Sequence, residues 1–121
     1  MNGANKAILR SHEAIVEEFD WGGLWWFASG KLGNTEAMAV GRCLIKPGQE
    51  NPRHYHPNCE EILHMVSGKI VHSLGDEAFE MGPGDTITIP PHVVHNARNM
   101  GTEDAIMAIS FSSAYRQFVK V

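Results

Sequence analysis

Two histidines and two glutamates gather in one ten-residue stretch, PRHYHPNCEE, at residues 52–61. His54 and His56 are separated by one residue, and side chains at such positions of an extended strand point to the same face. Two neighbouring imidazoles can chelate a divalent cation, and a carboxylate from Glu60 or Glu61 would supply a third ligand. The intervening sequence PNC is typical of a turn, so strand parity does not decide between the two glutamates. The alternative interpretation is a polar turn that is rich in histidine by chance.

A second segment that contains histidine, GDTITIPPHVVHNARN, follows at residues 84–99. Its pattern indicates a strand, a Pro-Pro turn and a further strand that begins near His95. In a closed antiparallel barrel, His95 could meet His54 and His56 in the interior. The two segments together therefore favour a metal site over a polar turn.

Short runs of β-branched and apolar residues alternate with turn residues roughly every eight to twelve positions from Trp21 onward. Each run is too short for a stable helix. This spacing predicts an all-β fold, a sandwich or barrel, and no long helices separate the runs as a parallel α/β sheet would need. The predicted strands are residues 24–29, 37–45, 61–67, 69–74, 78–81, 85–90, 93–98 and 105–111.

The two ends of the chain carry weaker patterns. Residues 7–19 are compatible with a helical face or with the start of a strand, and we leave this choice open. The C-terminal sequence SSAYRQFVKV, residues 112–121, is expected to be a tail or a short edge element.

Composition narrows the class of protein. A chain of 121 residues has the size of one domain, and its formal charge of −4 with scattered basic residues predicts no nucleic-acid partner. No apolar run is long enough to span a bilayer, and the N-terminal sequence lacks the apolar core of a secretory signal, so we expect no membrane partner and a cytoplasmic location. Cys43 and Cys59 form no CxxC pair, which suits a reducing compartment and predicts no disulfide.

The spacing of the histidines and glycines resembles the two sequence motifs of the cupins, a family of small β-barrels of the jelly-roll type, also described as a double-stranded β-helix. The first motif is a glycine, five residues, His-x-His, three or four residues, a glutamate, six residues and a glycine. The residues that match it are Gly48, His54, His56, Glu61 and Gly68. This match selects Glu61 over Glu60 as the third ligand.

The second cupin motif places a proline, a glycine, a histidine and an asparagine at fixed distances after a first glycine. The residues that match it are Gly84, Pro90, His95 and Asn99. His92 stands where the family has its second glycine, which leaves the ligands intact but puts the φ > 0 geometry of the turn in question. The resemblance implies a single cupin domain over residues 1–121, with the barrel at roughly 20–112 and an extension at each end.

The resemblance also implies one divalent metal ion per chain, which would be iron, manganese, nickel, zinc or copper, held by His54, His56, Glu61 and His95. Four protein ligands on an octahedral ion leave two positions open for water, dioxygen or a bidentate organic ligand. The leading hypothesis is a metal-dependent enzyme for a small polar organic molecule, either a dioxygenase or a non-redox isomerase, lyase or decarboxylase. The competing hypothesis is a non-catalytic module that binds a sugar or an organic acid through its metal.

An enzyme would need an acid or a base near the open metal positions. The catalytic residues stay unknown at this point, and the candidates are His72, His92, Arg42 and Tyr115. Arg42 and Cys43 occupy opposite faces of one predicted strand, so only one of them faces the interior. His72 follows a turn, across which strand parity does not carry.

Strand parity makes further predictions when Glu61 is taken as an inward-facing residue. Leu63 and Met65 then point inward and His64 points outward. Cys59 is expected to be a partly exposed thiol in the turn. In the aromatic run at residues 21–27, one side fills the barrel, and the other is predicted to form a homodimer contact or to pack within the core.

Overall fold

A computed structural model describes residues 7–121, and the first six residues of the predicted N-terminal extension lie outside it. Apart from one short 3₁₀ turn, the regular elements of the described chain are strands. In chain order its elements are the 3₁₀ turn Ser11–Glu13 and the strands β1 (Ile15–Phe19), β2 (Gly22–Ala28), β3 (Ala39–Ile45), β4 (His54–Tyr55), β5 (Glu61–Ser67), β6 (Ile70–Leu74), β7 (Glu77–Met81), β8 (Thr86–Ile89), β9 (His95–Asn99), β10 (Ala105–Phe111) and β11 (Val119–Lys120).

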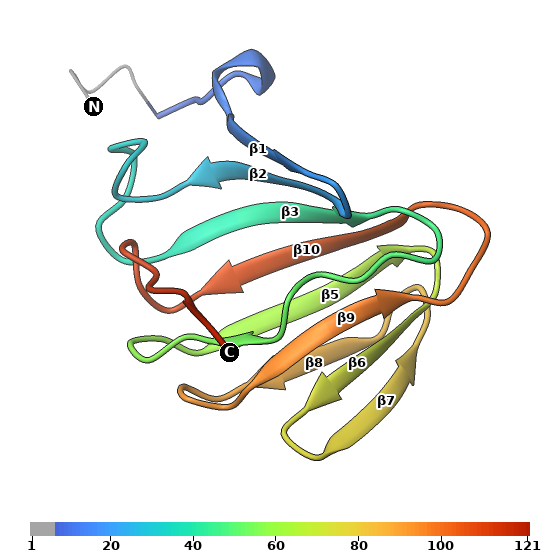
Figure 1. Ribbon diagram of the computed structural model, residues 1–121. Coiled ribbons are helices and arrows are strands. Elements are labelled where there is room, and N and C mark those ends of the chain that lie inside the picture. The colour runs from blue at the N-terminus through green and yellow to red at the C-terminus, as the bar shows by residue number, and fades with distance from the viewer. Residues whose placement is uncertain (1–6) are drawn as a thin grey trace.

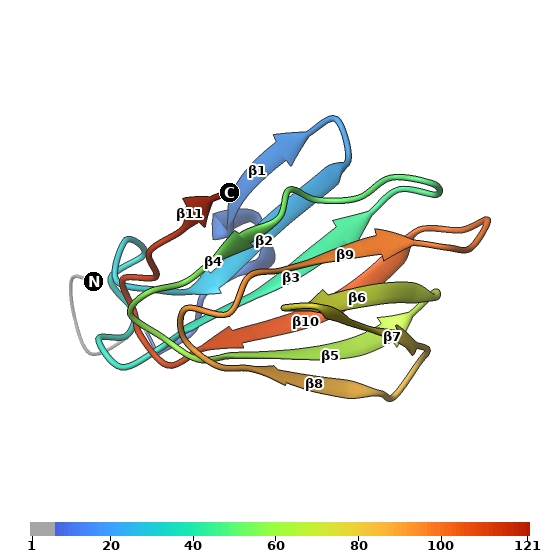
Figure 2. The same cartoon turned by 60° about the horizontal axis from the view of Figure 1, so that its bottom comes forward.

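The strands form two antiparallel sheets, which are the two walls of the barrel (Figure 1 and Figure 2). One sheet has six strands in the order β1-β2-β3-β10-β5-β8, and the other has five in the order β11-β4-β9-β6-β7. Strands far apart in the chain lie side by side, because β10 pairs with both β3 and β5 and β9 pairs with both β4 and β6. The all-β jelly-roll barrel predicted from the sequence is confirmed.

The two ends of the chain add strands at the edges of the sheets. The segment that the sequence left open is a short 3₁₀ turn followed by β1, which pairs with β2 from Ile15 to Phe19. At the other end, β11 pairs with β4. Both strands lie beyond the predicted barrel limits of 20–112.

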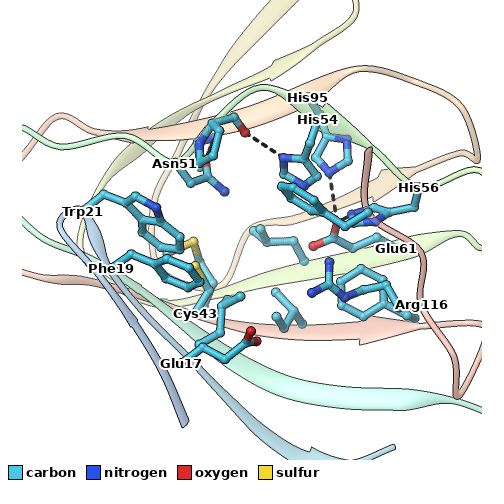
Figure 3. Close-up of a pocket in the computed structure, with 18 of the residues that line it drawn as sticks. Glu17, Phe19, Trp21, Cys43, Asn51, His54, His56, Glu61, His95 and Arg116 are labelled. Atoms are coloured by element: carbon cyan, nitrogen blue, oxygen red, sulfur yellow. Dashed lines mark hydrogen bonds and ion pairs between the residues drawn. The ribbon is translucent and has the colours of Figure 1, made fainter. Parts of the chain in front are cut away.

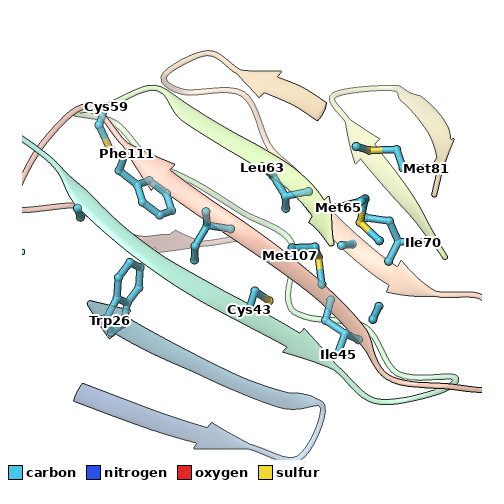
Figure 4. Packing of buried hydrophobic residues seen from close by; sticks show 14 residues of the cluster. Trp26, Cys43, Ile45, Cys59, Leu63, Met65, Ile70, Met81, Met107 and Phe111 are labelled. Carbon is cyan, nitrogen blue, oxygen red and sulfur yellow. The ribbon is translucent and has the colours of Figure 1, made fainter. Parts of the chain in front are cut away.

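Alternation of buried and exposed positions in β3, β5 and β10 builds the core (Figure 4). Leu63 and Met65 point inward and His64 is exposed, as parity predicts. Complete burial of a side chain such as Met65 stabilises the fold by roughly 1.5–3 kcal/mol. Trp26 joins this core, whereas Phe27 is 37% exposed and Trp25 is half-buried.

Cys59 corrects one expectation. Its side chain is only 3% exposed and belongs to the core cluster, so it is not the partly exposed thiol that its place in a turn suggested. A free thiol packs as a small apolar group, and a turn can therefore bury it without a polar partner. Cys43 is also buried, and both cysteines are free, as the sequence predicted.

The turn before β9 explains how a histidine replaces the motif glycine. His92 has φ 69°, which lies in the left-handed region that glycine adopts most easily. Its backbone N–H donates a hydrogen bond of 3.0 Å to the carbonyl of His56. The turn geometry of the motif is therefore kept without the glycine, and it connects two of the histidine-bearing segments.

Candidate metal centre

The four candidate ligands come from both walls of the barrel. His54 lies in β4 directly opposite His95 in β9, His56 lies just after β4, and Glu61 begins β5. All four are buried, with exposed fractions of 6, 2, 2 and 5% for His54, His56, His95 and Glu61. Their ligand atoms lie within 4.8 Å of one another, which is close to the separation that one ion with bonds of about 2 Å can bridge.

Backbone carbonyls fix the orientation of the three imidazoles. Because a carbonyl oxygen can only accept, each Nδ1 must carry the proton, and in the neutral ring the lone pair is then on Nε2. The hydrogen bonds run from His54 Nδ1 to Pro52 (2.7 Å), from His56 Nδ1 to Gln117 (2.7 Å) and from His95 Nδ1 to Val93 (2.9 Å). Partners of this kind are typical of histidines that bind a metal through the other nitrogen.

The inner atoms of the group have few protein partners of their own. His56 Nε2 is buried and has no hydrogen-bond partner within residues 7–121. It lies 3.4 Å from Glu61 Oε1, and His95 Nε2 lies 3.1 Å from the same oxygen. Three nitrogen lone pairs and a carboxylate that converge on one point would repel one another in the absence of a cation. The donor set fits a borderline divalent metal ion.

The pKa values of two of these groups agree with this interpretation. Burial lowers the pKa of His54 to about 3, so its imidazole is neutral near pH 7. Burial alone would raise the pKa of Glu61, but hydrogen bonds from His56 and His95, when their Nε2 atoms are protonated, outweigh this effect and lower it to about 2. A bound cation in place of those protons would stabilise the carboxylate in the same way. Near neutral pH the site therefore offers a neutral His54 and a negatively charged Glu61.

A cavity of about 690 Å³ extends from the candidate ligands between the two sheets. In Figure 3, Phe19 and Trp21 lie on one side of this cavity, and His56, Glu61 and Arg116 lie on the other. The space is large enough for a small organic molecule.

The C-terminal segment, which the sequence predicted as a tail or an edge element, forms part of the cavity wall. Asn58 holds it by two hydrogen bonds of 2.9 Å, because its amide donates to the carbonyl of Tyr115 and its Oδ1 accepts from the N–H of Gln117. Arg116 and Phe118 consequently line the cavity. Sequence reasoning missed both residues, because no motif or strand period predicts contacts across almost 60 positions of the chain.

Of the four acid or base candidates, only His72 lines the cavity. His72 is 1% exposed, its ring stacks on that of His95, and its Nδ1 has no hydrogen-bond partner in the described part of the chain. Arg42 faces away from the interior and lies over the ring of Trp25 at 4.7 Å. His92 and Tyr115 are exposed and lie outside the cavity.

Strand parity left open which member of two pairs, Arg42 and Cys43 or Glu60 and Glu61, faces the interior. The burial of the side chains answers both questions. Cys43 is the inward-facing member of its pair and lines the cavity, so Arg42 does not reach the candidate ligands. Glu61 is buried and Glu60 is exposed, in agreement with the motif spacing.

The family model for the cupin domain matches residues 41–111. This region is more than half of the chain, and it contains all four candidate ligands. The chain therefore belongs to the cupin family, as its motifs and its barrel indicate.

Two relatives and one solved structure illustrate the range of similarity. Germin-like protein 3-8 of Oryza sativa subsp. japonica is 32% identical over 85 residues, which cover 66% of this chain and 38% of that protein. Oxalate oxidase 1 of Hordeum vulgare is 30% identical over 88 residues, which cover 66% of this chain and 44% of that protein. The chain thus spans less than half the length of either relative.

The solved structure is that of Bacillus subtilis oxalate decarboxylase, described for its Mn(II) centres. It superposes with a TM-score of 0.84 at 22% identity, and the match covers 93% of this chain and 31% of that one. A likeness at this identity supports the fold alone. Among residues 7–121, no helix is long and apolar enough to cross a membrane.

Proposed function

We propose that His54, His56, Glu61 and His95 bind one divalent metal ion and that the chain is a metal-dependent enzyme acting on a small organic acid. The observation that carries this proposal is the convergence of three histidine Nε2 atoms and one buried carboxylate at the end of a cavity. When bound, the ion would act as a Lewis acid that polarises a carbonyl or acidifies a hydroxyl. The protein supplies the orientation of the ligands and the enclosed space.

An organic acid is proposed on two grounds. A divalent ion beside a cavity is suited to carboxylate and hydroxyl oxygens. In addition, oxalate stands in the names of a relative that is 30% identical and of a structural neighbour. Since the chain spans less than half of either protein, their activities do not carry over directly.

His72 is the residue we propose to contact the substrate beside the metal. Burial lowers the pKa of His72 to about 4, so the ring is neutral near pH 7. His72 lines the cavity, and the edge of its neutral ring that faces the cavity can form a hydrogen bond with a bound molecule. We expect His72→Phe to keep the metal and to lose turnover, because the substituted ring fills the space but offers no hydrogen bond.

Several finer predictions from the sequence remain part of this proposal. They are the choice between dioxygenase and non-redox chemistry, the identity of the metal, the homodimeric state, the cytoplasmic location and the single-domain boundaries. Light scattering tests the homodimer, and oxygen consumption against product analysis separates the two classes of reaction.

Elemental analysis of protein purified without chelators or a metal-affinity tag tests the metal site. We expect close to one divalent ion per chain in the native protein and its loss in His56→Ala. His64→Ala is the matched control, because His64 is exposed and lies outside the cavity. A native protein without stoichiometric metal, or a His56→Ala variant that keeps it, would refute the assignment.

Turnover is tested by incubation of the metal-loaded protein with a panel of oxalate, 2-hydroxy acids, 2-oxo acids and diones. Conversion of any of these compounds by the native protein, together with its loss in His72→Phe, supports the proposal that the protein is an enzyme. Tight binding of an organic acid without conversion of any member of the panel would favour the alternative, a non-catalytic module that binds through its metal.

A further inference from the structure

Arg116 is a cation held in an apolar setting beside the candidate metal centre. Its guanidinium carbon lies 4.7 Å from the ring centroid of Trp26, 5.1 Å from that of Phe111 and 5.7 Å from that of Phe118. Such contacts restrict the position of the guanidinium and leave its N–H groups available. Figure 3 shows it pointing towards Glu61.

The N–H groups of Arg116 lack a partner in the described chain. Neither a hydrogen bond nor an ion pair of Arg116 exists within residues 7–121, although it lines the cavity. Burial lowers the pKa of Arg116, while the nearby charges of Glu61 and Glu17 act in the opposite direction and favour its charged form. A partly buried cation with unpaired donors is expected to recruit an anion.

The rest of the cavity is lined mostly by apolar side chains and is too large for the smallest organic acids. A volume of about 690 Å³ corresponds to roughly 20 water molecules, so oxalate would leave most of it unfilled. The rings of Phe19 and Trp21 stack at 4.8 Å on the side opposite Arg116 (Figure 3). The apolar part of the lining also includes Leu24, Leu63, Met107 and Ile109.

The charged residues of the cavity wall also differ between the metal end and the end formed by Phe19 and Trp21. A divalent ion with Glu61 and Arg116 leaves a net positive charge at the metal end. Lys120, whose strand pairs it with His54, is a second cation of the lining. Glu17 lies near Arg116, because its carboxylate accepts a hydrogen bond of 2.7 Å from the Trp26 ring over which Arg116 lies. Asp20 follows β1 directly, next to Phe19, and also lines the cavity. A second carboxylate at that end would be repelled, whereas an uncharged apolar group would not.

We propose that Arg116 determines specificity by binding the carboxylate of a monocarboxylic acid, whose aromatic or other apolar body extends between the sheets towards Phe19 and Trp21. This inference rests on the proposed function, because it names the class of acid that would reach the metal. It assigns recognition to a residue from the C-terminal segment, outside both cupin motifs. It also separates the expected ligand from oxalate.

The first test uses the native protein as purified and measures binding by calorimetry. The probes are 3-phenylpropionate, the uncharged 3-phenylpropionamide, propionate and oxalate. We expect 3-phenylpropionate to bind about 10 to 100 times more tightly than the amide, because the amide oxygen can still accept from the guanidinium but the negative charge and the second acceptor oxygen of the carboxylate are lost. It should also bind about ten times more tightly than propionate, because the phenyl ring is buried.

The second test compares two arginines that both lie over a tryptophan ring at 4.7 Å. Arg116→Gln should weaken binding of 3-phenylpropionate about 10 to 100-fold and weaken binding of the amide much less. Arg42→Gln, which changes the arginine outside the cavity, should not alter the affinity for 3-phenylpropionate or for its amide. If Arg116 had a purely structural role, Arg116→Gln would weaken binding of both probes equally, and that result would overturn the proposal.

Arg116→Lys covers the case in which the glutamine variant fails to fold, because it keeps the charge and part of the stem. It should retain selectivity for the carboxylate over the amide but bind it more weakly, since an ammonium lacks the planar donor fork. Equal affinity of native protein for 3-phenylpropionate and its amide, or tighter binding of oxalate, would refute the inference whatever the variants do.

Metal content measured on the same samples separates the two proposals. Protein without metal that still prefers 3-phenylpropionate over the amide contradicts the proposed function and supports the role of Arg116. Protein with one metal ion and no such preference contradicts the role of Arg116 alone.

Discussion

At the residue scale, the same type of hydrogen bond orients all three proposed histidine ligands. Each donates its Nδ1–H to a backbone carbonyl, and two of these carbonyls lie only two residues before the histidine in the chain, at Pro52 and Val93. The local backbone thus presets the tautomer of His54 and His95 before a metal arrives. The third carbonyl belongs to Gln117, 61 positions away from His56, so only tertiary structure can preset His56.

The neighbouring glutamates provide a matched prediction at this scale. Glu61→Gln should weaken metal binding by more than about 100-fold, because loss of even an outer partner typically costs 10 to 100-fold. Glu60→Gln should have no effect, because Glu60 is exposed. Titration of the metal-free proteins with Mn(II) or Zn(II) measures both affinities, and equal affinities in the two variants would argue against Glu61 as a ligand.

The thiols give a second prediction at the residue scale. Burial raises the pKa of Cys43 to about 12 and also raises that of Cys59. At pH 8 roughly one Cys43 thiol in ten thousand would be ionised. Neither cysteine should therefore react with an aromatic disulfide reagent until the protein is unfolded.

An exposed cysteine introduced by Glu60→Cys serves as the control and should react at once in the folded protein. Rapid modification of two thiols per native chain would show that Cys43 and Cys59 are more accessible than their burial indicates.

At the scale of elements, alternation predicts which side chains point inward within one strand, but it gives no orientation for the next strand after a turn. The sequence correctly predicts strands at eight runs of residues, and parity along β5 places Leu63 and Met65 inside. Parity does not carry through the turn to β6, so the burial of His72 was not predictable. The position of the C-terminal segment was even less predictable from alternation, since two hydrogen bonds to the distant Asn58 determine its path.

This segment leads to a prediction about the metal. Removal of residues 114–121 should lower metal affinity about 10 to 100-fold although it removes no proposed ligand, because His56 loses its carbonyl partner and His54 loses the ring of Phe118 at 4.5 Å. Removal of residues 119–121 alone keeps Gln117 and Phe118 and should have a smaller effect. Equal metal affinity of the full chain and the longer deletion would contradict this role.

At the scale of the whole molecule, the proposed metal joins the two walls of the barrel. Glu61 belongs to the six-stranded sheet, whereas His54 and His95 belong to the five-stranded sheet. An ion bound by all of them links the two sheets on one side of the cavity. Because the unfolded chain does not hold these residues together, the ion binds the native state preferentially and must stabilise it.

Metal removal should therefore lower the thermal stability of the protein. At a free metal concentration 100 times the dissociation constant, binding adds about 2.7 kcal/mol to the free energy of unfolding, which raises Tm by several degrees in a domain of this size. Calorimetric scans with and without a chelator measure this difference. His56→Ala should show almost no difference between the two scans, and His64→Ala should behave like the native protein. A chelator effect of equal size in native protein and His56→Ala would mean that the stabilising ion binds elsewhere.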